Sequence, residues 1–73
     1  MTDRITIDDR ICHGKPVVRG TRVPVTVVLA ALAGGDTYED IERDYEVTTE
    51  DIRACISFAN DEISRQSYHP LGR

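Results

Sequence analysis

The sequence predicts a mainly α-helical fold in which a short N-terminal β arm, residues 1–24, precedes a three-helix unit, residues 25–65. Three observations predict it. β-Branched residues are interleaved with glycine and proline in the first third of the chain. Apolar residues then recur at helical spacing. Capping or helix-breaking residues separate the helical stretches. A chain of 73 residues suits one small domain, with residues 66–73 expected to fray.

The predicted arm starts with Ile5–Ile7, an alternating Ile-Thr-Ile segment, followed by a turn over residues 8–10. Residues 14–25, GKPVVRGTRVPV, hold two glycines, two prolines and three cations. Glycine relaxes the backbone and proline fixes it, so the valines between them form a shaped, strand-like segment. An isolated two-stranded arm is marginal. We therefore expect a homodimer whose arms pair or pack across the interface, with pairing inside one chain as the alternative.

The first helix is expected over residues 25–33. Pro24 suits the first turn of a helix, and Gly34 and Gly35 end it. The predicted core face carries apolar residues at positions i, i+3, i+4 and i+7, namely Val25, Val28, Leu29 and Leu32.

The second and third helices are expected over residues 38–45 and 49–65. Asp36 or Thr37 caps the second helix. Thr48 caps the third, where Asp51 completes a capping-box variant. The predicted core faces contain Tyr38, Ile41 and Tyr45 on one helix, and Ile52, Ile56, Ala59 and Ile63 with the neighbouring Cys55 on the other. The short turn between these two helices suits a helix-turn-helix unit.

The aromatic residues have more than one interpretation. Tyr38 and Tyr45 are expected at the edge of the core with their hydroxyls in water, rather than in an interface. Phe58 lies off the predicted stripe of the third helix, and either widens the core or marks a dimer patch.

Charge is distributed unevenly along the chain. Residues 1–25 carry five Lys and Arg against three Asp, a net +2, whereas residues 26–73 carry four Arg against ten acids, a net −6. Two copies could therefore pair head to tail through opposite charges. The overall net charge of −4 argues against a monomer that grips nucleic acid through its whole surface.

Residues for catalysis or metal binding are sparse. His13 stands beside Cys12, and adjacent residues on a strand face opposite ways. Cys12, His13, Cys55 and His69 lack the close ligand spacings of a zinc site. The carboxylates of residues 39–51 are expected to be helix caps and solvated surface rather than a metal cluster. We therefore expect no enzyme, no cofactor and no metal.

The two cysteines are expected to be reduced. Cys12 and Cys55 are far apart in the sequence and form no C-x-x-C pair. No signal peptide and no apolar run of membrane-spanning length is present. A reducing cytoplasmic setting follows, with a disulfide between the two cysteines as the alternative.

Cations of the arm are the candidate contact residues. A recognition helix presents its N-terminal residues to DNA, but residues 49–53 of the third helix read Thr-Glu-Asp-Ile-Arg and place two acids there. The candidates for a protein partner are Lys15, Arg19 and Arg22. The candidates for nucleic acid are Arg10, Lys15, Arg19, Arg22 and Arg53. Alternatively, the arm cations are solvent-exposed or paired internally, Arg22 with acids of the second helix.

Residues 5–63 resemble the domain-of-unknown-function family 433. The shared pattern is I-x-x-D, then GKPVVRGTRVPV, a short helix ending in glycine, x-x-E-D-I, and T-x-E-D-I-R-A-x-I-x-F-A. Members often have Tyr-Pro where Tyr45 is followed by Glu46 here. The resemblance implies a homeodomain-like or winged-helix-like fold. It also implies a VapB-like antitoxin role, because such proteins are often encoded beside a PIN-like ribonuclease toxin.

The resulting hypothesis is a non-enzymatic antitoxin that silences a PIN-like nuclease. Arg19 and Arg22, supported by Lys15, would enter the metal-binding carboxylates of the nuclease, since guanidinium groups bind carboxylates bidentately. One alternative is a DNA-binding autorepressor whose dimer places two helix-turn-helix units on successive major grooves. Another is a small structural or adaptor homodimer.

Overall fold

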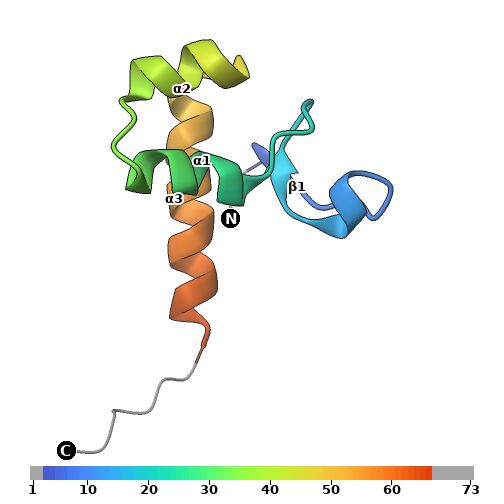
Figure 1. The fold of residues 1–73 in the computed structure, drawn as a ribbon. Helices are drawn as coiled ribbons and strands as arrows, with labels where there is room; N and C mark the ends of the chain where they lie inside the picture. The colour runs from blue at the N-terminus through green and yellow to red at the C-terminus, as the bar shows by residue number, and fades with distance from the viewer. Residues whose placement is uncertain (1–2, 67–73) are drawn as a thin grey trace, which may run out of the picture.

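The computed structural model describes residues 3–66, in which a short β arm precedes three helices (Figure 1). The elements are β1 (Ile5–Thr6), the 3-10 turn η1 (Cys12–Gly14), β2 (Val17–Val18), α1 (Val25–Ala33), α2 (Tyr38–Tyr45) and α3 (Thr49–Ser64). The predicted mainly α fold is confirmed, and α3 ends one residue before the predicted boundary. Apart from Gln66, the tail expected to fray lies outside the described residues.

Helix α3 is the axis on which the other elements are arranged. In Figure 1 it stands upright, α2 lies across its N-terminal end, α1 crosses in front of it, and the arm extends to one side. The C-terminal half of α3 continues beyond the crossing with α1. Across residues 3–66, no helix combines the length and the apolar character needed to cross a bilayer.

The arm is built around β2, which is paired on both sides within one chain. β1 pairs with it antiparallel, with Ile5 opposite Val18. On the other side, Val17 forms a bridge with Pro24, and the Val18 N–H donates to the Val23 carbonyl at 2.9 Å. Both β2 valines are buried. Both edges of β2 are therefore occupied within one chain, which is the intramolecular alternative, and the expected homodimer stays a prediction.

The first part of the arm departs from the predicted strand. β1 ends at Thr6, and Ile7 is 61% exposed instead of sharing the buried face of Ile5. Cys12 and His13, predicted as neighbours on a strand, instead lie in η1 with left-handed φ angles of 51° and 58°. The chain turns here because the Ile11 N–H donates to the Asp8 carbonyl and the Gly14 N–H to that of Ile11.

Core packing selects a different face of α3 from the one we predicted. Ile52, Cys55 and Phe58 are buried, whereas Ile56 is 41% exposed and Ile63 57% exposed. At about 100° per residue, Cys55 and Ile56 lie on opposite sides of Ile52 around the helix. α1, α2 and β1 pack against α3 on the Cys55 side. Phe58 therefore belongs to the core, which also contains Val25, Val28, Ile41 and Val47, with Tyr38 and Tyr45 at its edge.

The capping box predicted for α3 is present, and α2 begins with another one. The Asp40 N–H donates to Thr37 Oγ1 at 3.1 Å, and the Thr37 N–H donates to Asp40 Oδ2 at 3.0 Å. Thr48 and Asp51 repeat the arrangement at 3.1 and 2.9 Å. Thr37 rather than Asp36 is the cap of α2. These bonds satisfy backbone donors that lack partners inside the helix.

Helix α1 ends in a Schellman motif. The Asp36 N–H donates to the Ala31 carbonyl and the Gly35 N–H to the Leu32 carbonyl, both at 3.0 Å. Gly35 adopts a φ of +100°, and no atom lies within 4 Å of where its Cβ would be. The glycine is therefore required by the backbone angle and not by lack of space.

We expect Gly35→Ala to lower the free energy of unfolding by about 1–2 kcal/mol, the cost of a left-handed angle for an L-residue. Urea denaturation measures this change. Gly34→Ala is the matched control, because Gly34 has ordinary helical angles and its added Cβ would be 3.4 Å from the nearest atom. Equal effects of the two substitutions would contradict this account of the turn.

Candidate functional site

The tip of the arm is a tight turn that holds Arg19 and Arg22 on fixed backbone. The Thr21 N–H donates to the Val18 carbonyl at 3.0 Å, and Gly20 has the φ of +81° that a type II turn requires at its third position. The Thr21 hydroxyl donates to the same carbonyl at 2.7 Å and accepts from the Val23 N–H at 2.9 Å. This closes the loop, residues 19–22, on itself.

Arg22 combines a fixed main chain with a free side chain. Its carbonyl accepts a hydrogen bond from Cys12 Sγ at 3.4 Å, which ties the tip to η1. Its side chain is exposed and forms no hydrogen bond or ion pair with any residue in the described range. The alternative in which Arg22 pairs with acids of α2 is therefore not found.

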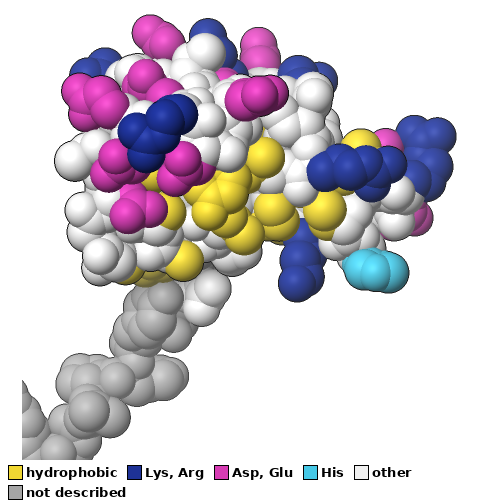
Figure 2. Space-filling view, turned by 45° about the horizontal axis from the view of Figure 1, so that its top comes forward, with side chains coloured by type: hydrophobic (Ala, Val, Ile, Leu, Met, Phe, Trp, Pro, Cys, Tyr) yellow, Lys and Arg dark blue, Asp and Glu magenta, His cyan; other side chains and the backbone are white. Residues whose placement is uncertain are grey.

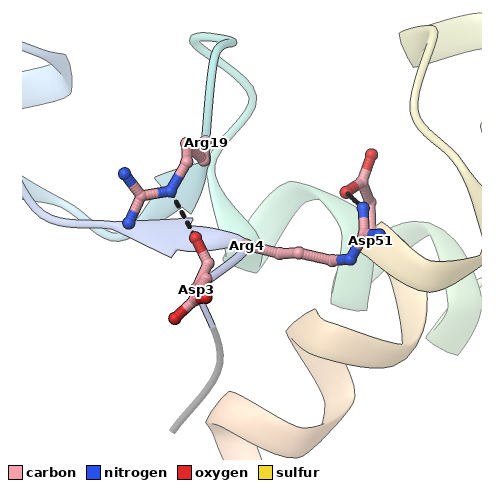
Figure 3. A pocket seen from close by; sticks show the side chains of 4 residues that line it. All are labelled: Asp3, Arg4, Arg19 and Asp51. Atoms are coloured by element: carbon pink, nitrogen blue, oxygen red, sulfur yellow. Dashed lines mark hydrogen bonds and ion pairs between the residues drawn. The ribbon is translucent and has the colours of Figure 1, made fainter.

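Arg19 is held against β1. Its N–H donates to the Arg4 carbonyl at 2.7 Å, and its Nε donates to the Asp3 carbonyl. Figure 3 shows the two terminal guanidinium nitrogens pointing away from Asp3. Arg19 therefore keeps one guanidinium edge available, in an orientation fixed by the strand beside it.

Lys15 lies at the base of the arm. It precedes Pro16, whose carbonyl accepts from the Val25 N–H at 3.0 Å where α1 begins. Its side chain is exposed and has no partner among residues 3–66. The extended segment between Lys15 and Arg19 separates their backbones by about 13 Å. The structure thus brings Arg19 and Arg22 together at the tip and leaves Lys15 apart.

The two remaining nucleic-acid candidates lie elsewhere. Arg10 is clamped by Asp8, with Nε 3.0 Å from Oδ1 and Nη2 2.9 Å from Oδ2. Hydrogen bonds from Arg10 hold the pKa of Asp8 below its ordinary value, so the loop neutralises its own cation. Arg53 is exposed on α3 and unpaired with the rest of the described chain. No hydrogen bond or ion pair of the described chain links Arg10 or Arg53 to the tip, residues 19–22.

An ion pair that sequence reasoning missed joins the arm to α3. Arg4 Nη1 lies 3.1 Å from Asp51 Oδ1, and together with Asp3 and Arg19 these residues line an open cleft of about 460 Å³ (Figure 3). The partners are 47 positions apart, and nothing in a single sequence pairs them. The one available signal was that Asp51, in its capping box, offers a carboxylate to any nearby cation.

The capping box and the ion pair together set the ionisation of Asp51. Burial raises the pKa of this carboxyl, but hydrogen bonds from the Thr48 N–H, the Arg4 guanidinium and the Thr48 hydroxyl outweigh burial and bring the pKa below its ordinary value. Asp51 is therefore an anion at neutral pH. Its charge is directed at Arg4 and at the first turn of α3 rather than at solvent.

The cysteines and histidine assemble no reactive centre in the described chain. Both cysteines are free thiols, so the alternative of a disulfide is not found. Burial, aided by the charge of Asp51, raises the pKa of Cys55 to about 11, which keeps the thiol protonated and unreactive. Within residues 3–66, no three Cys, His, Asp or Glu side chains gather to hold a metal ion. His69 lies outside the described residues.

Comparisons with known proteins identify relatives. A family model described as "Protein of unknown function (DUF433)" matches residues 5–59. The crystal structure of a DUF433 member from Anabaena variabilis is 25% identical with a TM-score of 0.78, over 88% of this chain and 64% of that one. The crystal structure of RV2018 from Mycobacterium tuberculosis is 35% identical with a TM-score of 0.66, over 71% of this chain and 24% of that one. No curated protein matches the chain significantly.

The chain therefore spans less than two thirds of the length of the first structure and about a quarter of the second. In both structures the matched segment is thus a part of a longer chain.

We expect Asp51→Asn to lower the free energy of unfolding at pH 7 by about 1 kcal/mol, through weaker hydrogen bonds to Thr48 and Arg4. The folded pKa of Asp51 lies below the unfolded value of about 3.9. The contribution is therefore complete above about pH 4 and is lost as the pH falls through the folded pKa. The difference in the free energy of unfolding between wild type and Asp51→Asn should therefore shrink over the same pH range.

Urea denaturation at a series of pH values from 7 downwards measures this difference. Asp9→Asn is the control, because Asp9 is exposed and forms no ion pair in the described chain. It should change stability little at any pH. An Asp51→Asn effect that stayed constant down to low pH would contradict the assigned role of the charge.

Proposed function

The chain belongs to the DUF433 family, and we propose that it is a non-enzymatic antitoxin-like protein that binds and inhibits a PIN-like ribonuclease. The geometry of Arg22 carries the proposal. A guanidinium without a partner among residues 3–66 stands on a turn that is fixed by hydrogen bonds from Cys12, Thr21 and Val23. A partner that binds it pays little for ordering the backbone.

The chemistry of the expected partner matches this residue. A PIN-like nuclease holds its metal ions with clustered carboxylates, as the family resemblance implies. A guanidinium group forms paired, charge-assisted hydrogen bonds with a carboxylate. Arg22 entering such a cluster would compete with metal ion and RNA for the same oxygens. Arg19 adds a second cation on the same turn, with one edge already engaged by Asp3.

Lys15 has a supporting role in this proposal. It lies at the base of the arm, so it would contact the rim of the nuclease site while the tip enters it.

Two free thiols are compatible with a protein that acts in the reducing cytoplasm.

The second candidate function is a DNA-binding autorepressor. It is favoured by the three-residue link, residues 46–48, between α2 and α3. It is also favoured by Arg53, which is exposed on α3 and has no partner in the described chain. The first turn of α3 weakens it, because Glu50 is exposed there and repels phosphates. The third candidate is an adaptor homodimer, which would use neither the cations of the arm nor Arg53.

We expect the Arg19→Ala, Arg22→Ala double variant to lose inhibition of the PIN-like nuclease encoded beside this chain, with Arg22→Ala alone accounting for most of the loss. Removal of one partner from a charged pair at an interface weakens the free energy of binding by roughly 2–5 kcal/mol. The variant concentration needed for inhibition should therefore rise greatly. An RNA-cleavage assay titrated with each variant measures the effect.

Arg65→Ala is the matched control, since it removes an exposed arginine at the end of α3 and should leave inhibition unchanged. Full inhibition of the nuclease by the double variant would contradict the proposal. The absence of a PIN-like reading frame beside the gene would count against the assignment of this partner.

For the DNA-binding candidate, we expect affinity for the upstream DNA of the gene to fall steeply between low and physiological salt, because bound cations are released from phosphates. Gel-shift titrations at two salt concentrations, with and without the nuclease, test it. Arg53→Ala should weaken binding if α3 contacts the duplex. No shift at low salt under either condition removes this candidate.

A further inference from the structure

Helix α1 presents an uncharged outer face to solvent. None of its nine residues is charged, yet only Val25 and Val28 are buried. Ala30 and Ala33 are exposed, and Val27 is only partly covered. The exposed Thr26 is its one polar residue, and a helix with so little polar surface is normally covered on most sides. Something outside the described chain is therefore expected to cover this face.

The two flanks of this face carry opposite charges. In Figure 2 an apolar area lies in the middle of the molecule; carboxylates are grouped on the side of α2, with some cations among them, and cations predominate on the side of the arm. On α2 and its C-cap, Glu39 and Glu46 are exposed and without a partner among residues 3–66. On the arm, Lys15 and Arg22 are likewise exposed and unpaired.

We propose that a second copy of this chain covers the α1 face, in a two-fold symmetric dimer. The two-fold axis lies in the plane of the face, perpendicular to the line that joins its two flanks, and places α1 against α1 of the other copy. The same rotation brings the basic arm of each copy over the acidic α2 of the other. A surface with an apolar centre between a positive and a negative flank is complementary to itself under this operation.

Charge complementarity selects a second copy as the occupant. The arm segment carries a net +2 and the rest of the chain a net −6, so the dimer satisfies both flanks twice. A uniformly acidic partner would be repelled by α2, and a uniformly basic one by the arm. The small side chains of Ala30 and Ala33 allow two helix axes to approach to about 8 Å, the close end of the usual range.

The size of the face sets the strength of the dimer. Helix α1 is about 13 Å long, so contact between the two copies of α1 alone falls short of the roughly 1,200 Å² of a stable interface. Contacts between the arm of each copy and α2 of the other must supply the rest of the buried area. The dimer should therefore depend on concentration and weaken as salt screens the charges.

This inference does not depend on the proposed function. If both are correct, the cations of the arm are occupied in the dimer and in the nuclease complex alike. The two assemblies would then compete. Tests on the chain alone distinguish failure of the dimer from failure of nuclease binding.

The first experiment measures self-association by sedimentation velocity over a range of concentrations. We expect Ala30→Glu to raise the dimer dissociation constant more than about tenfold, because it buries a charge opposite its own symmetry mate. Ala30 is exposed and glutamate favours helices, so the variant should fold, as circular dichroism would verify. Ile63→Glu is the control, since it places the same charge on an apolar residue that is 57% exposed on α3.

The second experiment exchanges the charges. One variant carries Lys15→Glu and Arg22→Glu, and the other carries Glu39→Lys and Glu46→Lys. Each alone should be monomeric, because the exchanged residues then face side chains of the same sign on the other copy. An equimolar mixture should dimerise, because both contacts become attractive in the heterodimer.

Three outcomes would overturn the proposal: a monomeric wild-type chain at every concentration, a dimer abolished by Ile63→Glu but not by Ala30→Glu, and a mixture of charge variants that stays monomeric. Loss of nuclease binding by Ala30→Glu in a chain that is always monomeric would instead assign the α1 face to the nuclease.

Discussion

Burial of β2 between two other segments is the constraint on which the arm depends. Val17 and Val18 are almost completely inaccessible, with β1 on one side and residues 23–24 on the other. To reach both sides, the chain must reverse within residues 19–22. It must also enter α1 directly afterwards, where the Val25 N–H binds the Pro16 carbonyl. The tip turn and the start of the helical unit therefore follow from the same pairing.

Ion pairs determine which charges remain available to a partner. Local pairs engage Arg10 with Asp8 and Arg43 with Asp40 and Asp44. Exposed pairs of this kind add little stability, typically below about 1 kcal/mol, but they cancel charge where they lie. Within the described part of the chain, the cations left unpaired include Lys15 and Arg22. The basic character of the arm is thus concentrated at its base and its tip.

The arm and the helices are joined by a contact of a different kind. Arg4 reaches Asp51, a residue that also caps α3. One carboxylate therefore fixes the start of the longest helix and the position of β1 relative to it. Because Arg19 is bonded to the neighbouring residues of β1, the orientation of the tip is linked to α3 through this short chain of contacts.

Much of the fold was predictable because its signals are local. Capping residues, glycines after a helix and apolar spacing act within a few positions, and they predicted the bounds of α1, α2 and the start of α3. The burial of Val17 and Val18, by contrast, depends on segments on both sides of β2. The sequence therefore indicated a shaped arm without indicating whether it pairs within or between chains.

The sequence by itself determined the helices, their caps and the cationic composition of the arm, because each depends on near neighbours. Only the tertiary structure decided which face of α3 is buried, since Cys55 and Ile56 are both apolar and packing by other elements selects between them. It also decided that, among the described residues, Arg10 is clamped by Asp8, Arg19 has one guanidinium edge bound and Arg22 has no side-chain partner. Those outcomes depend on where backbone carbonyls and carboxylates lie in space, which residue type and spacing do not specify.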